Sequence, residues 1–224
     1  DHPVMAIIGV TEGLIGTFGN ILTIIAVLRF KKLQTGSNFI LLSIAVADLF
    51  SLSTVFMGAS LDALKFNGYH GTWSAICYVT LFAGFMGGTS NVGGICLTAW
   101  DRFLAIKFPI FYRNRITNDK WKIVILILWI ICLTKVITET VLFVDVRKSC
   151  AIETTYDQQV YFFTVMLYFI FISVITSVLY ANIGFLVFRR AKFVKTGDQD
   201  SVASKNHQRT QMKITKIMTM VFCK

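Results

Sequence analysis

The stretch Trp100-Asp101-Arg102-Phe103 ends a long apolar segment that begins near Cys77. Cys77 and Arg102 are 25 positions apart, which in an α-helix is roughly 37 Å, about the thickness of a bilayer with its interfaces. One helix therefore carries a thiol at one membrane surface and a charged pair at the other. Because both charges are costly in hydrocarbon, this placement predicts a functional switch at a membrane boundary; an ordinary interfacial anchor is the alternative.

The composition restricts the fold class. Hydrophobic residues make up 55% of the 224-residue chain, charged residues make up 15%, and the mean hydropathy is +0.65. The sequence predicts an all-α, multi-pass membrane helix bundle in a single domain, residues 1–224, with five full transmembrane helices and the start of a sixth. The expected helices cover about 4–30, 38–62, 74–107, 120–143, 158–190 and 208–224, with a flexible cytoplasmic loop at about 191–207.

The basic residues predict the orientation. Seventeen lysines and arginines fall in the three loops assigned to one side, and three fall on the other side. This bias places the three basic loops in the cytoplasm and the amino terminus outside the cell. A nucleic-acid partner is not expected, because the basic residues flank membrane spans and form no separate soluble module. The chain has no nucleophile–base constellation, so we expect no enzymatic activity of its own.

Several motifs occur in order along the chain, each at a suitable membrane depth. They are Gly19-Asn20, the run Leu42-Ser43-Ile44-Ala45-Val46-Ala47-Asp48-Leu49, Trp73 before Cys77, Asp101-Arg102-Phe103, Pro109, Trp129 and Tyr180. Together they resemble the rhodopsin-like (class A) G-protein-coupled receptors over essentially the whole chain. The motifs do not indicate a ligand, so the chain resembles an orphan receptor of this family. The resemblance implies a plasma-membrane receptor, with the lipid bilayer, an extracellular ligand and a heterotrimeric G protein as partners.

The chain departs from the family pattern in three places. Phe103 stands where tyrosine is usual, and Ile172 stands where the fifth helix usually has proline. The chain also stops at Lys224, so we expect a receptor truncated within the sixth helix. The alternatives to a signalling receptor are a non-signalling truncated receptor or another multi-pass membrane protein such as a transporter; a light-sensing opsin-like member also stays open.

Two cysteines, Cys77 and Cys150, are expected on the outer side, where the compartment permits a disulfide. With the resemblance in support, we predict that they pair. Closing 73 positions should stabilise the fold by about 4 kcal/mol in the chain-entropy model.

At the cytoplasmic face, the resemblance implies that Asp101 holds Arg102 in the inactive state and that activation releases Arg102. Tyr180 would then support the open form. Ile110, just after Pro109, would fill a hydrophobic pocket on the G protein.

Inside the membrane, Asp48 is the clearest ionisable group. The resemblance implies an allosteric sodium ion at Asp48 and Asn91; the alternative is that Asp48 serves only helix packing through Asn20. Trp129 is expected to pack between helices. Lys135 and Glu139 are four residues apart, so they should neutralise each other on one helix face, or else reach the outer cavity or a partner.

The ligand pocket is expected in the outer half of the bundle. Seven positions after Cys77, where amine receptors have an aspartate, this chain has Gly84, so the ligand is not expected to be a biogenic amine. The alternative role for the glycines here is close helix packing. The expected pocket residues are Gly84, Phe85, Gly88, Ile152, Thr164 and Tyr168.

Overall fold

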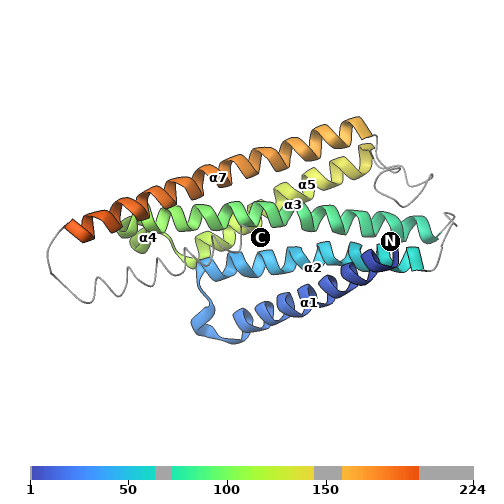
Figure 1. Ribbon diagram of the computed structural model, residues 1–224, viewed down its shortest axis with the longest axis horizontal. Helices are drawn as coiled ribbons and strands as arrows, with labels where there is room; N and C mark the ends of the chain where they lie inside the picture. Colours follow the sequence, from blue (N-terminus) through green and yellow to red (C-terminus); the bar gives the residue numbers. More distant parts are fainter. Residues whose placement is uncertain (1, 64–71, 144–157, 197–224) are drawn as a thin grey trace.

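The computed structural model describes residues 2–63, 72–143 and 158–196 of the chain. These residues form α1 (His2–Arg29), the 3-10 helix η1 (Lys31–Leu33), α2 (Gly36–Ala63), α3 (Thr72–Lys107), α4 (Pro109–Arg115), α5 (Asn118–Phe143) and α7 (Gln158–Thr196). Figure 1 shows the five long helices side by side with their axes roughly parallel, and α4 at one end of the bundle. The prediction of an all-α membrane bundle is confirmed. The expected sixth helix, 208–224, lies outside the described residues.

The helix ends lie close to the expected positions, with one larger difference. Helix α7 continues to Thr196, so residues 191–196, which we expected in a loop, are helical. Helical hydrogen bonding continues into the basic segment because nothing there interrupts it: no proline or glycine occurs between residues 191 and 196. The short helix α4 was not expected; it begins at Pro109, where a proline suits the first turn of a helix.

Four of the described helices could cross a membrane by length and composition: Val10–Arg29, Gly36–Thr54, Asn118–Leu142 and Phe163–Arg190. Helix α3, with 36 residues, is also long enough, but glycine, serine and asparagine interrupt its middle, and α3 is not among these four. The difference follows from its position, because α3 packs against α2, α4, α5 and α7. A helix surrounded by other helices can carry glycine, serine and asparagine where a lipid-facing helix carries leucine and isoleucine.

Glycines allow α3 to approach its neighbours closely. A Cβ atom at Gly87 would collide with the backbone of Ser51 and Ala47 on α2, and one at Gly94 would collide with Ile44. On another face, a Cβ at Gly93 would meet Leu128 of α5. The stripe of small residues therefore sets how near α2 and α5 lie to the central helix.

Replacing Gly87 with alanine should force α2 away from α3, because the added Cβ would collide with the Ser51 backbone nitrogen. We expect a loss of about 2 kcal/mol or more in unfolding free energy, measured as a lower midpoint of thermal unfolding of the purified receptor. Gly88→Ala is the matched control, because no atom lies within 4 Å of a Cβ added at Gly88. Equal stability of the two variants would contradict the close-packing argument.

Candidate functional site

The carboxylate of Asp101 is the centre of a buried polar cluster at the end of α3. Asp101 is 1% exposed. The Ser37 hydroxyl, from the start of α2, donates to Asp101 Oδ2 at 2.8 Å, and the Tyr112 hydroxyl, from α4, donates to Oδ1 at 2.5 Å. Each carboxylate oxygen therefore has a hydrogen-bond donor from a different element, so the cluster joins α2, α3 and α4.

The neighbouring Arg102 makes a looser contact with the same carboxylate. Its Nε atom lies 3.8 Å from Asp101 Oδ2, which is ionic range but too long for a hydrogen bond. Within the described part of the chain, this buried Nε has no hydrogen-bond partner. The arrangement therefore holds Asp101 firmly and Arg102 weakly.

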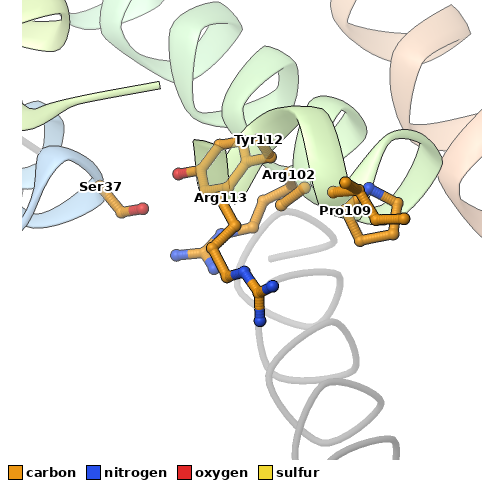
Figure 2. Close-up of a pocket in the computed structure, with 7 residues that line it drawn as sticks. Ser37, Arg102, Pro109, Tyr112 and Arg113 are labelled. Atoms are coloured by element: carbon orange, nitrogen blue, oxygen red, sulfur yellow. The ribbon is translucent and has the colours of Figure 1, made fainter. Parts of the chain in front are cut away.

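Arg102 lies at an open cavity of about 410 Å³. In Figure 2 the Tyr112 hydroxyl is turned toward Ser37, and the Arg102 and Arg113 side chains extend on the same side of α4. Ile110 beside the cavity is 73% exposed. The cavity thus combines two cations with an exposed apolar side chain. Its lining residues are Ser37, Arg102, Ala105, Pro109, Ile110, Tyr112 and Arg113.

Burial raises the pKa of the Tyr112 phenol above its usual value of 10.0, and the hydrogen bond to Asp101 raises it further. For an acid, a higher pKa in the folded state means that the protonated, donating form is retained below pH 10 and is lost only as the pH rises through the folded value. The Tyr112–Asp101 hydrogen bond is therefore present at every physiological pH.

The sequence pointed to Asp101, Arg102, Pro109 and Ile110 at this site but missed Ser37 and Tyr112. A signal was available for Tyr112, because a tyrosine followed by Arg113 and Arg115 stands in the helix that Pro109 begins. Tyr180, on α7, is half-buried and close enough to Arg102 to interact with its charge.

Deeper in the bundle, Asp48 accepts hydrogen bonds from two amides. The Asn91 Nδ2 group of α3 donates to Asp48 Oδ1, and the Asn20 side chain of α1 bonds to the same carboxylate. This geometry fits the helix-packing interpretation, because the Asp48 carboxylate already has hydrogen-bond donors from both α1 and α3. A sodium ion would need Asn91 to turn its amide oxygen, instead of its nitrogen, toward Asp48, so the sodium site stays a prediction.

Trp129 occupies a position between helices. Its indole nitrogen donates to Ser43 Oγ of α2 at 2.8 Å, and its ring centroid lies 6.0 Å from that of Phe50. The contact ties α5 to α2.

The expected pocket residues lie on different faces. A Cβ at Gly84 would meet the Thr54 side chain, which favours the packing alternative for this glycine, whereas Gly88 faces open space. Phe85 packs against the apolar cluster around Cys132 and against the one around Cys77. Thr164 is half-buried on α7.

Ile152 lies outside the described residues, as does Cys150. The disulfide between Cys150 and the buried Cys77 therefore stays a prediction.

Comparison with known proteins identifies the family. The sequence matches the family described as 7 transmembrane receptor (rhodopsin family) over residues 19–224. The chain belongs to this family of rhodopsin-like receptors. Its members are receptors and not enzymes, which confirms the expectation of no enzymatic activity and removes the transporter alternative.

Several receptors are similar to part of this chain. It is 34% identical over 113 residues to a 5-hydroxytryptamine receptor 2B of Dichotomyctere fluviatilis, covering 50% of the chain and 24% of that protein. It is 31% identical over 123 residues to dopamine receptor 2 of Caenorhabditis elegans, covering 54% and 14%. It is 34% identical over 114 residues to the alpha-2B adrenergic receptor of Rattus norvegicus, covering 51% and 25%. These alignments span about a quarter or less of each relative.

The receptor has a second charged pair, near the end of α5. Lys135 Nζ donates to Glu139 Oε1 at 2.7 Å, and the side chains are 21% and 6% exposed. Lys135 Nζ also lies 5.0 Å from the centroid of the Tyr168 ring on α7. The Tyr168 hydroxyl in turn donates to the carbonyl of Thr89 on α3 at 3.2 Å. The pair therefore belongs to a chain of contacts across α5, α7 and α3.

Glu139→Gln should leave the Lys135 ammonium without a counter-charge. We expect a loss of about 2–4 kcal/mol in stability, because removing one partner of a buried pair is costly and the partial exposure of Lys135 lessens the effect. Thermal unfolding of the purified receptor would measure it.

The matched control is Lys122→Gln, which breaks the exposed Lys122–Asp119 pair, whose side chains are 55% and 82% exposed. That change should lower the unfolding free energy by less than about 1 kcal/mol. If the Glu139 and Lys122 variants are equally stable, the Lys135–Glu139 pair is not a structural element of the receptor.

Proposed function

We propose that this chain is part of a receptor that binds an extracellular ligand and activates a heterotrimeric G protein through release of Arg102. The supporting observation is that the adjacent Asp101 and Arg102 differ in how firmly their side chains are held. Asp101 accepts two short hydrogen bonds from neighbouring elements, while Arg102 has only a 3.8 Å ionic contact with it and lies at the open cavity. Arg102 can therefore leave while Asp101 stays in place.

The release is a shift of population between two states. An ion pair at this distance, with the Arg102 side chain 24% exposed, stabilises the closed arrangement, in which Arg102 stays beside Asp101, by no more than about 1 kcal/mol. A ligand that favours the open arrangement by more than this amount shifts the equilibrium. The exposed Ile110, beside the two arginines of the cavity, offers an apolar contact for the G protein.

Substitution of the two charges should have opposite effects on signalling. Asp101→Asn removes the charge that attracts Arg102, so basal nucleotide exchange on the G protein should rise, by up to about fivefold. Arg102→Ala should abolish ligand-stimulated exchange. The assay uses the full-length receptor in membranes with purified G protein.

Arg115→Ala is the matched control, because Arg115 is an exposed arginine of α4 that does not line the cavity. Its exchange rate should equal that of the unaltered receptor. Unchanged exchange in both the Asp101 and Arg102 variants would overturn the proposed switch.

We further infer that the ligand does not form an ion pair with a carboxylate at position 84 of α3. Gly84, at the position of the amine-binding aspartate, has no side chain, and its missing Cβ accommodates Thr54. Similarity to receptors named for 5-hydroxytryptamine, dopamine and adrenergic ligands covers only about half of this chain.

Dopamine, 5-hydroxytryptamine and noradrenaline should therefore fail to stimulate nucleotide exchange by the full-length receptor, since a buried ammonium needs an opposite charge. The Asp101→Asn variant serves as a positive control, because its raised basal exchange shows that the receptor couples. Saturable stimulation by any of these amines would disprove this inference about the ligand and leave the switch intact.

A further inference from the structure

Two side chains approach the same oxygen atom of Asp101. The Ser37 hydroxyl donates to Oδ2 at 2.8 Å, and the Arg102 Nε atom lies 3.8 Å from that oxygen. The other oxygen, Oδ1, accepts a hydrogen bond from Tyr112. Among the described helices, the buried Arg102 Nε has no hydrogen-bond partner. Ser37 therefore holds the oxygen that Arg102 would need for a hydrogen bond of its own.

The first turn of α5 fixes the position of Ser37. The backbone N–H of Gly36, directly before Ser37, is one of the donors at the start of a helix that find no acceptor within that helix. Asn118 Oδ1, on α5, accepts a hydrogen bond from this N–H at 2.8 Å, and Asn118 Nδ2 donates to the Gln34 carbonyl at 3.0 Å. One side chain of α5 therefore holds the backbone that leads into Ser37 at two points.

Trp121, in the same turn of α5, packs on this backbone as well. Trp121 is 5% exposed, and a Cβ atom added at the buried Gly36 would collide with its indole ring. The start of α2 therefore has little freedom to shift. A shift of about 1 Å would lengthen the 2.8 Å bond from Ser37 to Asp101 beyond the usual hydrogen-bond range. The contacts with α5 thus keep Ser37 on the carboxylate.

We propose that Ser37 competes with Arg102 for Asp101 Oδ2 and so keeps Arg102 loosely held. Without the serine hydroxyl, the carboxylate can pivot about Oδ1 and accept the Arg102 Nε–H. Such a charge-assisted hydrogen bond is stronger than the present 3.8 Å contact. Asn118 and Trp121 are positioning residues, because they act through Ser37. The competition itself is independent of signalling, whereas its effect on nucleotide exchange rests on the proposed function.

Removing the serine hydroxyl should have the opposite effect to removing the carboxylate. Ser37→Ala should strengthen the contact between Arg102 and Asp101, so basal nucleotide exchange by the full-length receptor should fall about threefold. A purely structural role for Ser37 predicts the reverse, because the loss of a bond in the closed arrangement would raise basal exchange. In the Asp101→Asn background, where the competition is absent, Ser37→Ala should have no further effect.

The state of Arg102 can also be measured without a G protein. Phenylglyoxal modifies arginine side chains, and peptide mass spectrometry of the treated full-length receptor gives the rate at each arginine. Ser37→Ala should slow the modification of Arg102 about threefold, since its guanidinium gains a hydrogen-bonded partner. Arg113, which lines the same cavity from α4, should react at an unchanged rate and serves as the internal control.

Variants of Asn118 test the positioning. Asn118→Ala should slow the modification of Arg102 about twofold, because Ser37 is then held less firmly. In the Ser37→Ala background it should have no further effect. Asn118→Asp, whose carboxylate still accepts the Gly36 N–H, should react at the original rate.

Ser43→Ala is the matched control for Ser37→Ala. It makes the same change on the same helix, at a serine that accepts a hydrogen bond from Trp129 of α5 at 2.8 Å. The modification of Arg102 and basal nucleotide exchange should both stay unchanged. Thermal unfolding shows whether each variant is folded; if Ser37→Ala is not, the comparison of Asn118→Ala with Asn118→Asp provides the test.

An equal or faster modification of Arg102 in the Ser37→Ala variant would overturn the proposal. Equal rates in Asn118→Ala and Asn118→Asp would show that the bond to Gly36 does not position Ser37. Slower modification of Arg102 with unchanged nucleotide exchange would support the competition and contradict the proposed function. The two measurements therefore separate failure of this inference from failure of the activation switch.

Discussion

The close approach of α3 to its neighbours is the constraint on which the rest of this receptor depends. Apolar side chains gain little by leaving lipid for a helix interface, so the helices associate through close packing and polar contacts. Gly87 and Gly94 bring α2 near α3, and Gly93 brings α5 near it. Only at these separations can Asn91 reach Asp48 and can Trp129 of α5 reach Ser43 of α2.

The same arrangement provides partners for three carboxylates of the described bundle. Asp48 receives amide donors from two helices, Asp101 receives hydroxyl donors from two elements, and Glu139 receives the Lys135 ammonium. Each of the three carboxylates therefore has a different kind of partner: amides, hydroxyls or an ammonium group. Amide and hydroxyl partners hold a carboxylate in place, whereas Arg102 contacts Asp101 only at 3.8 Å, and the proposed switch depends on this difference.

The end of the bundle that carries Arg102 combines a cavity with a contact between two distant segments. The cavity at Arg102 lies between α2, α3 and α4 and offers cations beside an exposed isoleucine. At the same end, the Asn118 side chain joins the loop after α1 to the start of α5.

The sequence by itself determined the membrane class, the helical fold and the position of the Asp101-Arg102 pair, because hydrophobic length and charge placement are properties of the chain alone. It also located the Lys135–Glu139 pair, since four residues make one helical turn. It could not find Ser37 and Tyr112 as partners of Asp101, because their positions depend on how three elements meet. Only the tertiary structure decided that Gly84 faces Thr54 while Gly88 faces open space, and that Asn118 joins two basic segments 82 positions apart. The physical reason is that helical periodicity relates residues within one helix, whereas the rotation of one helix against another is set by packing across the whole bundle.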